Sequence, residues 1–232
     1  MRLFAALRPP VEVLDHLGAA LDAVGRRSDE RPGALRWVAP SDQHVTLAFY
    51  GEVPEGRMPE LTDDLARTAH GVLPFALALS GAGLVDRRVL WTGCAGDTAA
   101  LAGLMAGAAA AAPTAVADGR VRSRAHLTVA RVRDRAGRND RQNDGSRGPG
   151  GRARPAGLSP AEVVRALAVY RGPVWTVEEL VLVESRLGAG PHGGPLYTDV
   201  AELPLWSQRA VPRADRALWQ DGRHGAAPRS GE

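Results

Sequence analysis

Two stretches of this chain, 82 residues apart, carry the same alternation: HVTLAFYG (44–51) and HLTVARVR (126–133). Successive side chains of a β-strand face opposite sides of the sheet. Each stretch therefore predicts a strand with an aliphatic face toward a core and a polar His-x-Thr face turned away from it. The four polar residues are His44, Thr46, His126 and Thr128. One such strand in each half suggests two related lobes whose polar faces meet.

The segments around these strands predict an α+β fold. Helical spacing of apolar residues marks 11–24 and 58–70, an alanine-rich helix follows Asp97, and Ser159 with Glu162 forms a capping box for another. Short strand patterns lie between them, at 2–7, 35–38, 75–80, 88–93, 174–187 and 196–205. We therefore expect a bilobal protein with two pseudo-symmetric antiparallel sheets, outer helices and a central cleft.

The same patterns set the expected domain limits. Residues 133–157 hold almost no apolar side chain, and the tail after Leu205 is again rich in Arg, Gly and Pro. Segments that bury nothing do not recover the entropy of ordering. We expect a single bilobal domain over 1–205 with a flexible insertion at 133–157, and a disordered tail at 206–232.

The four aromatic residues Phe4, Trp37, Phe49 and Trp91 could each stack on a nucleobase. Core positions are the preferred interpretation for all of them. Within the first His-x-Thr strand, the alternation assigns Phe49 to the core and Tyr50 to the face of His44.

The composition limits the cellular compartments in which the protein is expected. Of the 232 residues, 29 are basic and none of these is lysine, which indicates coding bias, and the net charge is only +3. Cys94 is the only cysteine, so a reducing compartment is compatible. No stretch resembles a signal peptide or a bilayer-spanning segment. We expect a cytoplasmic protein that does not contact a membrane.

Two imidazoles and two hydroxyls around one small volume favour phosphoryl transfer. Imidazole titrates near neutral pH, so a pair can supply one base and one acid. Threonine hydroxyls can donate to phosphate oxygens. The sequence has no metal-ligand spacing, GxSxG motif or P-loop. Acid–base catalysis without a cofactor is the remaining interpretation, and the sequence alone does not say which histidine is the acid.

Four stretches, LRWVAPSDQHVTLAFYGEV, GAGLVDRRVLW, HLTVARVR and LVLVESRL, resemble the 2H phosphoesterases. Within them the chain is similar to the RNA 2′,3′-cyclic phosphodiesterases, also described as 2′-5′ RNA ligases. The resemblance implies hydrolysis of a terminal cyclic phosphate to a 2′-phosphomonoester. It implies His44 as proton donor and His126 as proton acceptor, with phosphate oxygens bound by Thr46 and Thr128.

Arg131 matches an arginine of the family's second motif and is the expected partner of the phosphate charge. Strict alternation places it on the face opposite His126, so a bulge or a side chain reaching round the strand end is needed.

The resemblance implies an RNA partner with a cyclic phosphate end, tRNA fragments included, and a monomeric protein. The alternatives are another small cyclic nucleotide as substrate, 2′-5′ joining of RNA ends, or a non-catalytic RNA-binding module. Retention of both histidines and both threonines favours the enzyme.

Overall fold

The structure is a computed structural model that describes residues 1–26, 35–111, 125–133, 158–190 and 193–206. The insertion expected at 133–157 lies outside the described residues except for Arg133, and so does the expected tail from residue 207 on. The limits of the expected domain therefore stay a prediction.

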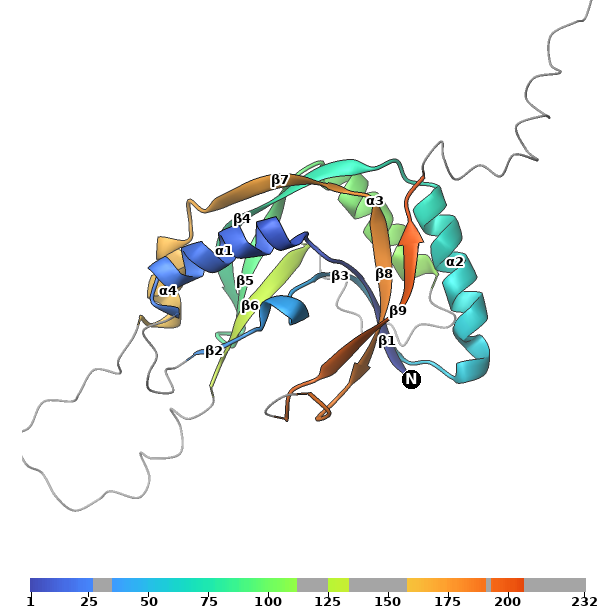
Figure 1. Cartoon of the computed structure of the whole chain (residues 1–232), viewed down its shortest axis with the longest axis horizontal. Coiled ribbons are helices and arrows are strands. Elements are labelled where there is room, and N and C mark those ends of the chain that lie inside the picture. The colour runs from blue at the N-terminus through green and yellow to red at the C-terminus, as the bar shows by residue number, and fades with distance from the viewer. Residues whose placement is uncertain (27–34, 112–124, 134–157, 191–192, 207–232) are drawn as a thin grey trace, which may run out of the picture.

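The described part of the chain is built on one curled antiparallel sheet that forms a half-barrel (Figure 1). Its strands run in the order β7-β4-β5-β6-β3-β1-β8-β9, and β2 pairs with β6. The bounds are β1 Arg2–Leu7, β2 Leu35–Trp37, β3 Val45–Glu52, β4 Phe75–Val85, β5 Val89–Gly96, β6 His126–Val132, β7 Arg171–Val177, β8 Glu179–Arg186 and β9 Leu196–Pro204.

The α+β class is confirmed, with one correction to the arrangement of the strands. Two separate sheets were expected, and the two halves, β7-β4-β5-β6 and β3-β1-β8-β9, instead share one sheet. A single residue pair between β3 and β6, Val45 with Leu127, joins them. The junction between the halves is therefore the place where the two His-x-Thr strands meet.

Among the described residues, four α-helices cover this sheet: α1 Val11–Ala23, α2 Met58–His70, α3 Thr98–Ala110 and α4 Pro160–Ala166. Helices α1 and α4 pack against β7 and β4, whereas α2 packs against β8 and β9, and α3 against β3. Each of the three longer helices buries a narrow stripe, as Leu61, Leu65 and Ala69 do in α2. The capping box of Ser159 and Glu162 at α4 is present as expected.

Strand β1 shows how the two faces of the sheet differ. Leu3, Ala5 and Leu7 belong to the main core that the helices cover. Phe4 and Ala6 point the other way and form a small second cluster with β8. The face opposite the main core is therefore partly apolar as well, and it carries the candidate site.

Candidate active site at the junction of the two halves

The junction pair brings the two motifs together in a reciprocal way. Val45 and Leu127 are both fully buried in the main core, so their strand neighbours face away from it. In an antiparallel pair, the residue before one partner lies opposite the residue after the other. Around Val45 and Leu127, each histidine therefore lies opposite the threonine of the other motif. His44 thus lies opposite Thr128, and Thr46 opposite His126. All four sequence-predicted His and Thr residues come to one place on one face.

The ring of His44 is held from two sides. Its Nδ1 lies 2.7 Å from the carbonyl oxygen of Asp42, which ends the 3-10 turn Pro40–Asp42 just before β3. A carbonyl only accepts hydrogen bonds, so Nδ1 carries the hydrogen and Nε2 is the nitrogen left to exchange a proton. Phe4 stacks at 4.8 Å between ring centroids, and Tyr197 meets the ring edge-on at 5.2 Å.

These surroundings lower the pKa of His44 from 6.5 to about 4. Desolvation by burial is the largest cause, and the guanidinium groups of Arg8 and Arg131 add to it. The carbonyl of Asp42 and the carboxylate of Asp199 act in the opposite direction without compensating. His44 is therefore neutral at pH 7 in the ligand-free protein.

This shift predicts a loss of stability in mild acid. Because the folded-state pKa of about 4 lies below the ordinary histidine value of 6.5, the unfolded chain binds a proton first as pH falls. The contribution is complete above pH 6.5 and is lost between pH 6.5 and 4. We expect the free energy of unfolding to fall by about 2 kcal/mol more in the wild type than in His44→Asn between pH 7 and pH 5. Urea unfolding of both proteins at the two pH values measures it, and equal losses would contradict it.

An arginine from β1's end fixes the loop that carries Asp42. Arg8 donates from Nε to Asp199 of β9 at 3.0 Å and from Nη1 to the carbonyl of Ser41 at 3.2 Å. It thereby ties three segments together beside His44. Sequence reasoning missed Arg8, Tyr197 and Asp199; the only signal was the spacing of Tyr197 and Asp199, two residues apart on one strand and therefore on one face.

His126 lies beside β5. It pairs with Gly93, and its ring centroid is 5.9 Å from that of Trp91. Trp91 pairs with Thr128 and so shares the face of the motif. Its indole lies against Gly83, where an added Cβ would come within 2.2 Å of the ring, so only glycine fits under it.

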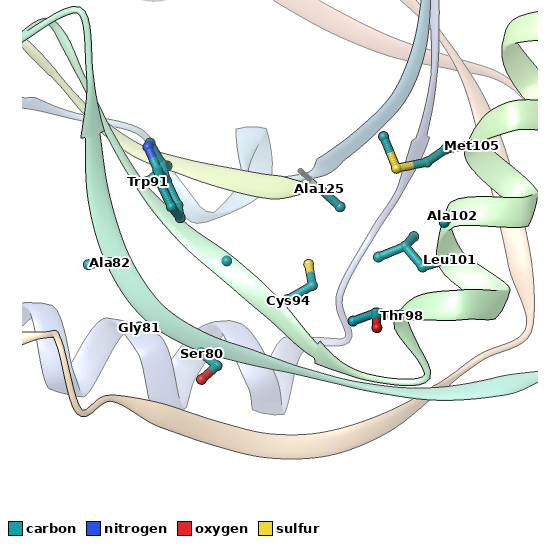
Figure 2. Close-up of a pocket in the computed structure, with 11 residues that line it drawn as sticks. Ser80, Gly81, Ala82, Trp91, Cys94, Thr98, Leu101, Ala102, Met105 and Ala125 are labelled. Carbon is teal, nitrogen blue, oxygen red and sulfur yellow. The ribbon is translucent and has the colours of Figure 1, made fainter. Parts of the chain in front are cut away.

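Trp91 also lines a cavity of about 500 Å³ between β4, β5, α3 and Ala125 (Figure 2). Cys94 belongs to the same lining, and burial raises the pKa of its thiol to about 12. A thiol held in its protonated form is a poor nucleophile. The only cysteine of the chain is therefore unsuited to covalent catalysis.

A bulge in β6 brings Arg131 to the face of the motif. Leu90 pairs with Ala130 and the next β5 residue, Trp91, pairs with Thr128, which leaves Val129 as the extra residue. Val129 and Ala130 are both buried, and Arg131 is exposed. The bulge thus shifts the alternation by one residue and removes the obstacle that strict alternation raised for Arg131.

A similar bulge in β3 overturns the expectation for Phe49 and Tyr50. Thr46 pairs with Ala6 and Ala48 with Ala5, so Leu47 is the extra residue. The alternation shifts there, and Phe49 comes to lie opposite Phe4 on the site's face. Tyr50 is buried and its hydroxyl donates to the carbonyl of Ala108 at 2.9 Å, whereas Phe49 is 44% exposed. The prediction of Phe49 in the core and Tyr50 on the His44 face is wrong. The hydrogen bond to α3 accounts for the inward turn of a polar ring.

The other aromatic candidates are buried to different degrees. Phe4 is 4% exposed but lies on the site's face, whereas Trp37 packs against the main core.

Within the part of the chain that is described, no three His, Cys, Asp or Glu side chains lie close enough together to hold a metal ion. No helix among the described residues is long and apolar enough to cross a bilayer.

Comparison with known proteins relates part of this chain to a family of phosphoesterases. The family model described as LigT like Phosphoesterase matches residues 9–91, which include the first motif. RNA 2′,3′-cyclic phosphodiesterases from Geobacillus stearothermophilus and Thermotoga maritima are 38% and 32% identical over 81 and 97 residues. These matches cover 32% and 40% of this chain. The chain spans only 26% and 50% of the length of those two relatives.

Solved structures extend the likeness over most of the chain. The structure of TT0787 from Thermus thermophilus has a TM-score of 0.58 and 26% identity, covering 90% of this chain and all of the other. E. coli LigT complexed with phosphate has the same TM-score at 23% identity, covering 89% and 98%, and shows the fold alone. The half-barrel fold is therefore shared with these solved structures. The family-model match and the curated relatives support the 2H phosphoesterase family for this chain.

Proposed function

We propose that this protein hydrolyses 2′,3′-cyclic phosphate ends of RNA to 2′-phosphomonoesters. The reciprocal placement of each histidine beside the threonine of the other motif carries the proposal. Such a placement supplies two groups for proton transfer and two hydroxyls that donate hydrogen bonds to phosphate oxygens. An in-line displacement at one phosphorus requires both kinds of group. The names of the curated relatives support RNA as the substrate.

The two histidines account for both proton transfers of the reaction. His126 accepts a proton from a water molecule as the water oxygen bonds to phosphorus. His44, protonated, gives its Nε2 proton to the 3′ oxygen as the bond from that oxygen to phosphorus breaks. Thr46 and Thr128 donate to the non-bridging oxygens, and Arg131 balances their negative charge. The phosphate remains on the 2′ oxygen.

Binding of the substrate has to charge His44 in this scheme, since its pKa of about 4 leaves it neutral in the free protein. The cyclic phosphate carries one negative charge. Placed beside His44, it favours the imidazolium directly and also offsets the effect of Arg131. Protonation of the donor is therefore coupled to the arrival of the anion.

The proposal predicts turnover without a metal. We expect the protein, dialysed against EDTA, to convert an oligonucleotide with a 2′,3′-cyclic phosphate end to the 2′-phosphate form. Chromatography against 2′- and 3′-phosphate standards identifies the product. A 3′-phosphate would mean that the wrong oxygen departs, and activity that needs an added divalent ion would contradict the two-histidine mechanism.

A further inference from the structure

We propose that Arg36 together with Arg131 forms a second phosphate subsite, which binds the phosphodiester next to the terminal nucleotide. This inference rests on the proposed function and narrows its substrate class. The preferred substrate is then an RNA oligonucleotide, and a cyclic mononucleotide would leave the Arg36 side of the subsite empty.

The pairing of β2 with β6 sets the two arginines side by side. Arg36 pairs directly with Arg131, between the pairs Leu35 with Val132 and Trp37 with Ala130. Residues directly opposite on antiparallel strands share a face. Leu35 is 5% exposed and belongs to the main core, so Arg36 faces away from it, and both arginines are exposed.

Two like charges in directly opposite positions destabilise a sheet unless something neutralises them. Neither Arg36 nor Arg131 forms an ion pair with any residue that the structure describes. Several other arginines do have a carboxylate partner, namely Arg8, Arg26, Arg57, Arg67 and Arg186. An anion held between Arg36 and Arg131 would remove the repulsion, and a phosphodiester suits two guanidinium groups because each can donate two hydrogen bonds to its oxygens.

This cationic pair is continuous with the active site. Arg131 acts electrostatically on both His44 and Tyr197, so its charge reaches the candidate active site. Arg36 lies directly opposite Arg131 on the neighbouring strand, about 5 Å away on the same face. Arg131 acts on His44 and Arg36 does not, so one phosphate at His44 leaves Arg36 unused, whereas the sugar-phosphate backbone of an oligonucleotide offers it a second phosphate. Arg133, exposed and two residues beyond Arg131, continues the positive charge along the end of β6.

The test compares Arg36→Gln with Arg57→Gln, which also removes one positive charge but from an ion pair with Glu60 at the start of α2. Each protein is assayed on a cyclic mononucleotide and on a trinucleotide with a cyclic phosphate end, at several salt concentrations. We expect Arg36→Gln to lower kcat/KM for the trinucleotide about tenfold and to leave the mononucleotide unchanged. The log–log salt slope for the trinucleotide should become shallower by about 0.7. Arg57→Gln should change neither substrate.

Equal losses on both substrates, or no loss on the trinucleotide, would overturn the subsite. A binding measurement separates this from failure of the proposed function. Fluorescence anisotropy with a labelled trinucleotide that already ends in a 2′-phosphate needs no turnover. Weaker binding by Arg36→Gln than by the wild type supports the subsite even if no cyclic substrate is hydrolysed, and equal binding refutes it.

Discussion

Alanine at His44 or at His126 is expected to lower turnover of a cyclic phosphate end by about 10²-fold or more, because each replacement removes one of the two proton-transfer groups. The comparison of kcat for wild type and variants on one oligonucleotide measures it. His70 provides a matched control, since it lies exposed at the end of α2 on the helix side of the sheet. His70→Ala should turn over at the wild-type rate.

Replacement of the threonines separates proton transfer from phosphate binding. Thr46→Ala and Thr128→Ala each remove a hydrogen bond to a charged oxygen, which is worth about 1.5–3 kcal/mol. We expect losses of about ten- to a hundredfold in kcat/KM, smaller than those of the histidine variants.

A folded His44→Ala or His126→Ala protein that keeps native turnover would exclude the two-histidine mechanism. Far-UV circular dichroism and unfolding curves establish that the variants are folded.

The sequence alone predicts which side chains of the two motif strands are buried, up to the first bulge of each strand. Alternation over 44–47 and 126–129 correctly separates the buried aliphatic residues from the His-x-Thr pairs, because core covers one face of each strand and the bulges at Leu47 and Val129 shift only the residues that follow them. The pairing of Val45 with Leu127, which makes one sheet of two halves, carries no local signal. It depends on contacts between segments 82 residues apart, and no pattern within either strand records them.

Bulges explain most of the remaining differences. An extra residue shifts the alternation without any change in composition, so LAF at 47–49 and VAR at 129–131 look like regular strand in the sequence. The shift sends Phe49 outward and Tyr50 inward, and it turns Arg131 toward the site. The clamp of Arg8 on Asp199 spans 191 positions, and only the folded sheet shows that these two charges meet beside His44.

The low pKa of His44 changes how the acid and base can be assigned. In the free protein the imidazole loses its proton near pH 4. The profile of kcat/KM reports the ionisations of the free enzyme, so its acidic limb should lie near pH 4. That limb appears in the wild type whether His44 acts as donor or as acceptor, because the singly protonated pair is the active form in both cases and the limbs belong to the pair. The wild-type profile alone therefore does not distinguish the two roles.

The residual activity of His126→Ala does distinguish them. With His126 removed, the pH dependence of kcat/KM follows His44 alone. If His44 is the proton donor, kcat/KM falls about tenfold for each pH unit above its pKa of about 4, hence about 10³-fold from pH 5 to pH 8. We expect this decline, measured after subtraction of the rate given by the variant that lacks both histidines. A residual rate that stays level from pH 5 to pH 8 would instead make neutral His44 the base, and it would exchange the roles of the two histidines while leaving the reaction itself unchanged.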